Sequence, residues 1–393
     1  MRPQNLGVHE LWLVRRSLAR SSVRTHVRLL RWCGYCRLGG GQEGARGPGE
    51  RLHRGYQAFT LALTVAYLLQ ECVYAYQERH DMDKVARVMF LLLCHVTSIA
   101  KQLVFYLDAD RVERMVAGLD EPLYNEPAAE SQRLLQGAAT WASRFVRLYS
   151  GCAVVTCTLW IIFPVIYHLR GQHVEFPAFA AVCLYSYYVT ALVGIANTTM
   201  DAFMATVLNQ CKTQLTILRL KFESLPERAA SLTGVHYDAA LMSLLVQCLV
   251  HYKHIVDTAA QLQHIFGIAI LVQFAIGGWI LCMAAYKIIS LSVLSIEFAS
   301  MVLFTSCILT ELFLYCYYGN EVTVESNRVV ESIYSMEWLQ TPVRFKRALL
   351  IVMERAKRPL RPVAGFIIPL SLDTFVKIIK SSYTFYAVLR QTK

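Results

Sequence analysis

Seven apolar segments, each about as long as a bilayer is thick, constrain this chain more than any other feature of its sequence. A helix that crosses the hydrocarbon core needs roughly 20 mainly apolar residues, because it rises about 1.5 Å per residue. The segments are Tyr56–Tyr76, Val85–Leu107, Ala142–Leu169, Phe179–Thr199, Ile265–Ile289, Ser292–Tyr317 and Gly365–Arg390. The pattern predicts an all-α membrane protein with seven transmembrane helices.

The charged residues lie mainly in the connections between these segments. Of the 39 Lys and Arg residues, 29 fall on the side that holds the N-terminus. Because basic residues are enriched in cytoplasmic loops, we expect a cytoplasmic N-terminus and an extracellular C-terminus. The net charge of +11 is then explained by contact with membrane lipids, and no nucleic-acid partner is expected.

Two amphipathic stretches and one glycine-rich stretch lie outside the apolar segments. Arginines at steps of four, from Arg16 to Arg28, predict a basic helix that lies on an anionic membrane surface. Residues 38–55 are expected to form a flexible tether. The fourth segment is expected to continue as a helix to about Phe222, and Leu241–Gln263 predicts an amphipathic helix before the fifth.

The sequence contains no recognisable catalytic or metal-binding motif. Asp110-Arg111-Val112 follows the second segment and is interpreted as part of a solvated loop. The Cys33–Cys36 pair is a CxxC without the second pair of ligands that a zinc site needs. We therefore predict neither an enzyme nor a bound cofactor or metal.

The closing apolar segment carries a polar stripe along one helical face. Each member lies three or four residues from another member: Asp373, Lys377, Lys380, Ser381, Thr384, Val388 and Gln391. An ionised side chain in hydrocarbon is costly, so such a face meets either a water-filled path or the interior of the helix bundle. Periodicity alone leaves both interpretations open.

Aromatic and small residues are enriched in the outer halves of the second, third, fourth and sixth segments. They are Val88, Met89, Phe90 and His95; Thr156, Leu159, Trp160 and Phe163; Phe179, Tyr185, Tyr188 and Val189; and Phe298, Met301, Val302 and Thr305. Converging helices with apolar walls and a few polar atoms can bind a small, volatile, weakly polar molecule. The alternative is ordinary helix packing with an aromatic belt at the membrane interface.

The C-terminal third resembles the insect odorant receptors. The resemblance rests on Tyr315-Cys-Tyr-Tyr-Gly-Asn-Glu-Val-Thr-Val-Glu-Ser326, Ile333-Tyr334-Ser-Met-Glu-Trp338, Pro369-Leu-Ser-Leu-Asp-Thr-Phe375 and Ser381-Ser-Tyr-Thr-Phe385. It covers about residues 310–391. The fourth-to-fifth connection is too short to resemble the olfactory co-receptor (Orco), so the chain resembles a ligand-tuning subunit.

This resemblance implies an odorant-gated, non-selective cation channel in the plasma membrane of olfactory sensory dendrites. It implies a tetramer around one central pore, shared with co-receptor subunits, and a small volatile organic odorant as ligand. The implied gate and constriction residues are Val388, Gln391 and Thr392, with Thr384 on the same face. Tyr334 and Trp338 are expected to pack in a cytoplasmic anchor that joins the subunits.

The implied organisation divides the chain into four parts. Residues 1–55 form the basic N-terminal segment and tether, and residues 56–318 form the first six helices and the pocket. Residues 319–362 form the anchor loop, and residues 363–393 form the pore-lining helix and its extracellular tail. A metabotropic seven-helix chemoreceptor without its own pore, and more remotely a transporter, are the alternatives.

One feature departs from what a cation channel needs. Lys377 and Lys380 lie on the polar stripe, and Arg390 lies at its end. Four copies would place a ring of positive charge in a cation path, which is electrostatically unfavourable. We therefore expect the chain to conduct poorly alone.

Overall fold

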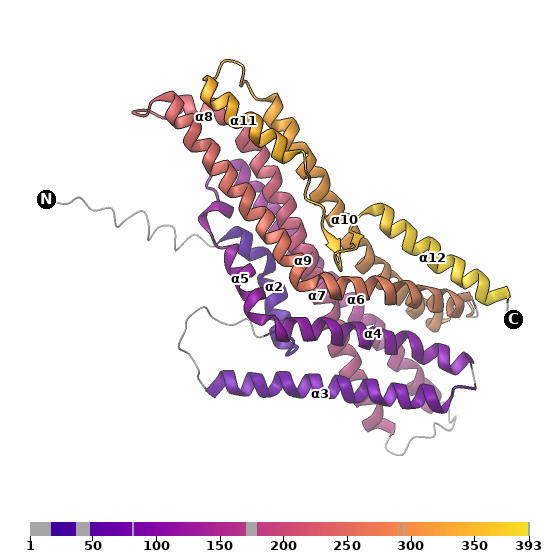
Figure 1. The fold of residues 1–393 in the computed structure, drawn as a ribbon. Helices are drawn as coiled ribbons and strands as arrows, with labels where there is room; N and C mark the ends of the chain where they lie inside the picture. Colours follow the sequence, from indigo (N-terminus) through magenta and orange to yellow (C-terminus); the bar gives the residue numbers. More distant parts are fainter. Residues whose placement is uncertain are drawn as a thin grey trace.

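The computed structural model describes residues 17–36, 48–80, 82–169, 179–289, 291–293 and 295–391. In these residues the chain is a bundle of long helices, with α8 and α11 at one end and α3, α4 and α12 at the other (Figure 1). The helices are α2 (Leu18–Trp32), α3 (Pro48–Gln77), α4 (Met82–Leu107), α5 (Ala109–Gly118), α6 (Ala129–Leu169), α7 (Phe179–Glu223), α8 (Leu225–Ser231), α9 (Tyr237–Ile289), α10 (Ile296–Ser335), α11 (Val343–Ala356) and α12 (Leu372–Gln391). A short 3-10 helix (Pro122–Tyr124) and two short strands, β1 (Val363–Ala364) and β2 (Ile368–Pro369), complete the described elements.

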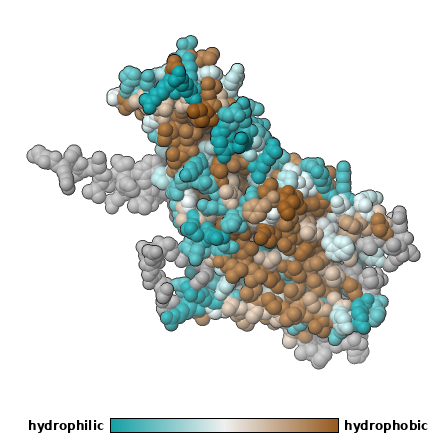
Figure 2. Space-filling view, viewed as in Figure 1, coloured by the Kyte–Doolittle hydropathy of each residue, from teal (hydrophilic) through white to brown (hydrophobic). Residues whose placement is uncertain are grey.

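Six of the described helices, α3, α4, α6, α7, α9 and α10, are long and apolar enough to cross a membrane. The helices α6, α7, α9 and α10 contain 40 to 53 residues, so they are about twice as long as a bilayer core is thick. They extend well beyond the apolar zone. Figure 2 shows that apolar side chains form a broad band over α3, α4 and the adjoining part of α9, whereas polar and apolar side chains are mixed near α8 and α11.

Helix α7 is at the centre of the bundle, and it contacts α2, α3, α4, α6, α9 and α10. In its most apolar window 78% of the residues are buried, against 11% in α3. The continuation of the fourth segment to about Phe222 is confirmed, since α7 ends at Glu223. Side chains on α7 therefore meet protein on nearly every side, and α3 is left to face the lipid.

A tight hairpin, not a helix, precedes α12. The prediction of one helix from Gly365 is wrong, because β1 and β2 pair antiparallel with Val363 opposite Pro369. Gly365 has φ of +56°, and a Cβ there would lie 2.4 Å from Leu271 of α9, so only glycine fits this turn. The hairpin therefore packs closely against α9, and the last helix begins directly after it.

Helix α12 starts at Leu372, where Ser371 caps it. The Ser371 hydroxyl accepts a hydrogen bond from the Thr374 N–H at 3.2 Å, which satisfies one of the donors that a helix start leaves unpaired. At 20 residues α12 is about 30 Å long, but it is not among the six described helices that are apolar enough to cross a membrane. It lies along α9, with contacts also to α10.

The apolar face of helix α2 is covered by protein, whereas its sequence pattern predicts that the membrane surface covers it. Its apolar face packs against α6 and α7, and Ala19, Val23 and Leu30 are fully buried there. Arg24 and Arg28 remain exposed. The amphipathic pattern was real, but protein covers its apolar face because the extensions of α6 and α7 provide an apolar partner.

Several element boundaries also differ from the prediction. Helix α3 begins at Pro48, inside the expected tether, and α10 runs to Ser335, so the expected loop 319–362 is helical in its first part. The amphipathic stretch before the fifth segment and that segment form one continuous helix, α9. Residues 1–16 and 37–47, which include Arg16 and most of the tether, lie outside the described residues.

Candidate functional site

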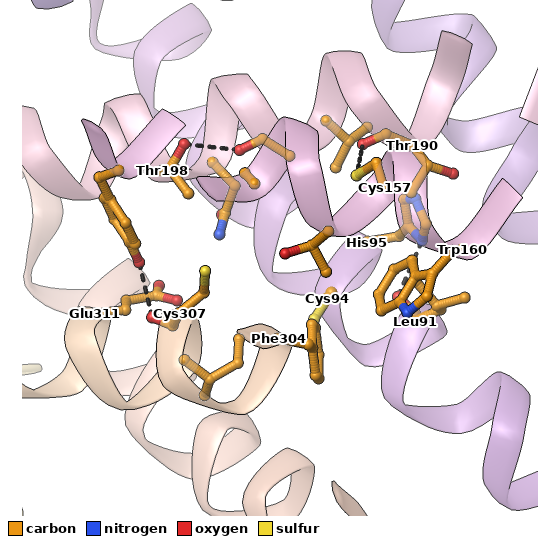
Figure 3. Close-up of a pocket in the computed structure, with 17 residues that line it drawn as sticks. Leu91, Cys94, His95, Cys157, Trp160, Thr190, Thr198, Phe304, Cys307 and Glu311 are labelled. Atoms are coloured by element: carbon orange, nitrogen blue, oxygen red, sulfur yellow. Dashed lines mark hydrogen bonds between the residues drawn. The ribbon is translucent and has the colours of Figure 1, made fainter. Parts of the chain in front are cut away.

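A cavity of about 80 Å³ lies among α4, α6, α7 and α10. Its wall is drawn in Figure 3, where Glu311 stands on one side and His95 and Trp160 on the other. It is lined by Leu91, Cys94 and His95 of α4; Tyr149, Ala153, Thr156, Cys157 and Trp160 of α6; Thr190, Val193, Gly194, Asn197 and Thr198 of α7; and Phe304, Cys307, Ile308 and Glu311 of α10. One water needs only roughly 10–15 Å³, so the space admits a small organic molecule.

Three aromatic rings hold one side of the cavity together. The ring centroids of Phe90 and Phe304 are 5.3 Å apart, those of Trp160 and Phe304 are 5.4 Å apart, and those of Phe90 and Trp160 are 5.8 Å apart. Tilted aromatic pairs at these separations are favourable. The cluster joins α4, α6 and α10 and offers a rigid apolar surface to a ligand.

Most hydroxyl groups on the wall are already engaged. Thr156 donates to the carbonyl of Cys152 at 2.8 Å, Thr198 donates to that of Gly194 at 2.9 Å, and Tyr149 donates to that of Cys307 at 2.9 Å. Such bonds satisfy a hydroxyl inside an apolar region. A ligand therefore meets a wall that recognises it mainly by shape and dispersion.

A buried ionic cluster adjoins the cavity at Glu311. Lys101 of α4 donates to Asp201 of α7 at 2.5 Å, to Glu311 of α10, and to the Asn197 side-chain oxygen at 3.0 Å. Tyr315 donates its hydroxyl to Asp201. Lys101, Asp201 and Glu311 are each at most 1% exposed, so the cluster ties three helices together out of contact with water.

The structure brings three of the predicted pocket residues, His95, Thr156 and Trp160, to the cavity wall. Phe90 lies behind the wall in the aromatic cluster. Val189 and Met301 are buried elsewhere, and Tyr188 and Val302 are more than 40% exposed. The half-buried remainder also lies off the wall: Val88, Met89, Leu159, Tyr185, Phe298 and Thr305. The side chains of Phe163 and Phe179 lie outside the described residues.

The polar wall residues Asn197 and Glu311, and the ionic cluster behind them, were not predicted from the sequence. A signal was present, because Lys101, Asp201 and Glu311 are ionisable residues within or beside apolar segments. Such residues mark functional or structural polar sites in membrane proteins. Their pairing could not be read from the sequence, since they lie 100 and 210 positions apart.

Helix α12 keeps its polar stripe on the open side of the molecule. Asp373, Lys377, Lys380, Ser381, Thr384 and Val388 are all exposed in the single chain. Lys377 and Asp373 form an ion pair of 2.6 Å. The side chain of Gln391 and the whole of Thr392 lie outside the described residues.

The opposite face of α12 packs on α9. The Ser382 hydroxyl donates to the carbonyl of Gly278 at 2.9 Å, and the Phe385 and Trp279 rings are 6.2 Å apart. Tyr386 is buried. The polar stripe is thus part of the surface of α12 that its own chain leaves uncovered, together with the exposed apolar side chains of Val376, Tyr383 and Phe385.

The two expected anchor aromatics lie close together at the end of α10. The Trp338 indole N–H donates to the Tyr334 carbonyl at 3.3 Å. The Tyr334 side chain is 71% exposed, so it makes little contact within its own chain. In the part of the chain that the structure describes, no three His, Cys, Asp or Glu side chains gather as a metal ion would require.

Comparison with known proteins gives a consistent result. The family model "7tm Odorant receptor" matches residues 81–383. Putative odorant receptor 92a of Drosophila melanogaster is 26% identical over 56% of this chain, which spans about half (54%) of that relative's length. Odorant receptor 94a of the same species is 23% identical, over 79% of this chain and 81% of the relative.

The fold also matches a solved structure. The insect olfactory receptor OR5 from Machilis hrabei, in complex with eugenol, superimposes with a TM-score of 0.82. The match covers 94% of this chain and 98% of that chain at 14% sequence identity. The likeness therefore extends over nearly the whole molecule, although few residues are shared.

Proposed function

The chain belongs to the 7tm odorant receptor family, and on that premise we propose that it is the odorant-binding subunit of a ligand-gated, non-selective cation channel. A small volatile molecule binds in the cavity among α4, α6, α7 and α10. Binding shifts the equilibrium toward the conducting state, because the ligand has a higher affinity for that state. The pore is shared with co-receptor subunits in a heterotetramer.

The single observation that carries the proposal is the uncovered polar face of α12. A membrane helix with exposed Lys377, Lys380 and Thr384 needs water or another subunit beside it, since lipid solvates charge poorly. A central pore provides that water. In this proposal the gate lies at the outer end of α12 and is formed by Thr384, Val388, Gln391 and Thr392, the residues that the family resemblance implies.

Charge and exposure support the proposed orientation and assembly. The basic connections favour a cytoplasmic N-terminus and an extracellular C-terminus, which suits a receptor in the plasma membrane of an olfactory neuron. Tyr334, whose ring is exposed in the single chain, would be covered by a neighbouring subunit. The lysines on α12 favour mixed assembly, because co-receptor subunits dilute their charge around the pore.

Cysteine accessibility along α12 tests the pore. We expect Thr384→Cys and Val388→Cys to react with a charged, water-soluble thiol reagent and to alter the current once the channel is opened. Ser382→Cys, on the face that bonds to Gly278, is the matched control and should stay unreactive. Equal protection of all three positions in every conducting state would overturn the pore assignment.

Recording with and without the co-receptor tests the assembly. We expect odorant-evoked cation current when both subunits are expressed and little current from this chain alone. Robust cation current from the chain alone would overturn the need for a partner. A C-terminal tag that is labelled only after permeabilisation would overturn the orientation and favour a metabotropic receptor.

A further inference from the structure

The side-chain amide of Asn197 has a fixed orientation on the cavity wall. Lys101 donates to its oxygen at 3.0 Å, and an ammonium group has donors only. The oxygen of Asn197 must therefore face Lys101, and its NH₂ group must be directed elsewhere. Among the described residues this NH₂ group has no hydrogen-bond acceptor, although Asn197 lines the cavity.

Lys101 cannot turn away to release this arrangement. Its ammonium group also donates to Asp201 and Glu311, and its side chain is 1% exposed. A cation bonded to an amide oxygen withdraws electron density from the amide nitrogen, which strengthens the N–H groups as donors. The buried cluster thus presents a strong, oriented donor to the cavity.

Little else on the wall competes for this role. Three of the four hydroxyl groups that line the cavity, those of Tyr149, Thr156 and Thr198, already donate to carbonyl oxygens. The His95 Nδ1 atom lies 2.9 Å from the Leu91 carbonyl oxygen, so Nδ1 is the donor nitrogen, and Nε2, which has no partner among the described residues, is an acceptor. The Asn197 NH₂ group is left as the strong donor without a partner among the described wall residues.

We propose that the ligand is a neutral carbonyl compound: a ketone, an aldehyde or an ester. This inference rests on the proposed function. The carbonyl oxygen of the ligand accepts a hydrogen bond from the Asn197 NH₂ group. Its hydrocarbon part lies against the rings of Trp160 and Phe304, which form the apolar side of the cavity.

The same wall discriminates against charged ligands. A carboxylate would lie beside Glu311 in a region without water, which is unfavourable. An alkylammonium ion has donors only, so it cannot accept from Asn197, and the Glu311 carboxylate on the wall is already paired with Lys101. A hydrocarbon fits the apolar surface but leaves the Asn197 donor unpaired, which costs binding free energy.

The test is a matched ligand series with both channel subunits expressed. Each ketone is compared with the hydrocarbon in which a methylene replaces the carbonyl, and with the carboxylic acid and the amine of the same length. We expect the ketone to activate at about tenfold lower concentration than its hydrocarbon analogue, the effect of one net hydrogen bond. Equal potency of ketone and hydrocarbon in the wild type would overturn the inference without any variant.

Two variants locate the preference at Asn197. Asn197→Leu removes the donor, and Asn197→Asp keeps the size and the bond from Lys101 but has no NH₂ group. Both should bring the ratio of ketone to hydrocarbon potency close to one. Asn209→Asp, the same chemical change on α7 away from the cavity, should keep the wild-type ratio.

The outcomes separate the inference from the function on which it rests. Variants that reach the surface and keep the tenfold ratio would overturn the role of Asn197. Activation by ligands of every class at similar concentrations would overturn the inference and leave the proposed function standing. If no ligand evokes current with both subunits at the surface, the proposed function fails as well.

Discussion

Two regions of this molecule hold charged side chains on its helices, and the surroundings of these charges differ: one region is buried and the other is exposed. The Lys101–Asp201–Glu311 cluster is closed, with every charged side chain at most 1% exposed. On α12 the Lys377–Asp373 pair is open, with its side chains 73% and 71% exposed. The first is satisfied within one chain, and the second is left for water or for another subunit.

The difference is one of dielectric environment. Charges in the closed cluster interact strongly because little water screens them, and losing one partner leaves another charge buried and unpaired. Charges on α12 interact weakly with each other if water surrounds them. The closed region is therefore suited to hold helices in register and to orient Asn197, whereas the open region is suited to contact a permeating ion.

The strongest test of this contrast removes the cation from the closed cluster. Lys101→Met should destabilise the protein by about 3–5 kcal/mol, because Asp201 and Glu311 then share a buried site without a counter-charge. The measurement is the thermal unfolding of detergent-solubilised protein. Lys380→Met, on the exposed stripe, is the control and should change the transition little; an unaltered transition in Lys101→Met would contradict the role of the cluster.

A second test concerns the apolar side of the cavity. Trp160→Ala should raise the half-maximal concentration of a small odorant about 10- to 100-fold, because the loss of a large buried contact costs about 1.5–3 kcal/mol. Dose–response curves in cells that express both subunits measure it. Tyr188→Ala, at a position that is 45% exposed and off the cavity wall, is the control and should leave the half-maximal concentration unchanged. If Tyr188→Ala raised this concentration and Trp160→Ala did not, the ligand would bind nearer the outer surface than the cavity described above.

A third test uses a buried group that has no counter-charge. His26 of α2 lies 3.2 Å from the Thr206 hydroxyl, and burial lowers its pKa to about 4. Between pH 6.5 and about 4 the unfolded chain takes up a proton at His26 that the folded chain does not. Stability is therefore complete above pH 6.5 and falls on acidification, by about 1.4 kcal/mol at pH 5.5.

Comparison with His26→Gln isolates this contribution. The variant should lose less stability than the wild type between pH 7 and pH 5.5, in thermal unfolding of the solubilised protein. Identical pH dependence in the two proteins would show that His26 titrates normally. In that case burial would not prevent His26 from taking up a proton, and the buried Lys101 cluster would not be representative of the other buried polar groups in this bundle.

The smallest expected effect concerns the open charges. Replacing Lys377 and Lys380 by Gln should raise cation current through the mixed channel a few-fold, roughly the effect of removing a local positive potential. Single-channel conductance at low and high salt measures it, and the gain should shrink at high salt because the charges are screened. Conductance that does not change at any salt concentration would place these lysines away from the ion path.

Helices α7 and α12 show most clearly which features of the fold could be predicted from the sequence. The helical continuation of α7 beyond the fourth segment and the polar stripe of α12 depend on local periodicity, so both were predictable. The hairpin before α12 was not, because it depends on how closely Gly365 approaches Leu271 of α9. The position of α2 was missed for a similar reason: an amphipathic face specifies that it must be covered, and lipid or protein can cover it.

The candidate cavity shows the same limit. His95, Thr156 and Trp160 could be chosen because they are polar or aromatic residues in apolar segments. Asn197 could not be chosen in this way, because its role depends on Lys101 fixing its amide. Which turn of each helix faces the cavity is set by helix rotation and packing, which a single sequence does not encode locally.

Length, hydropathy and charge asymmetry by themselves determined that this chain is an all-α membrane protein with a polar face on its last helix. Those features depend on the transfer of each side chain between water and lipid, which is a property of local sequence. Only the tertiary structure decided which charges pair and where the cavity lies. Pairing joins residues 100 and 210 positions apart, and its free energy arises only once packed helices have excluded water from between them.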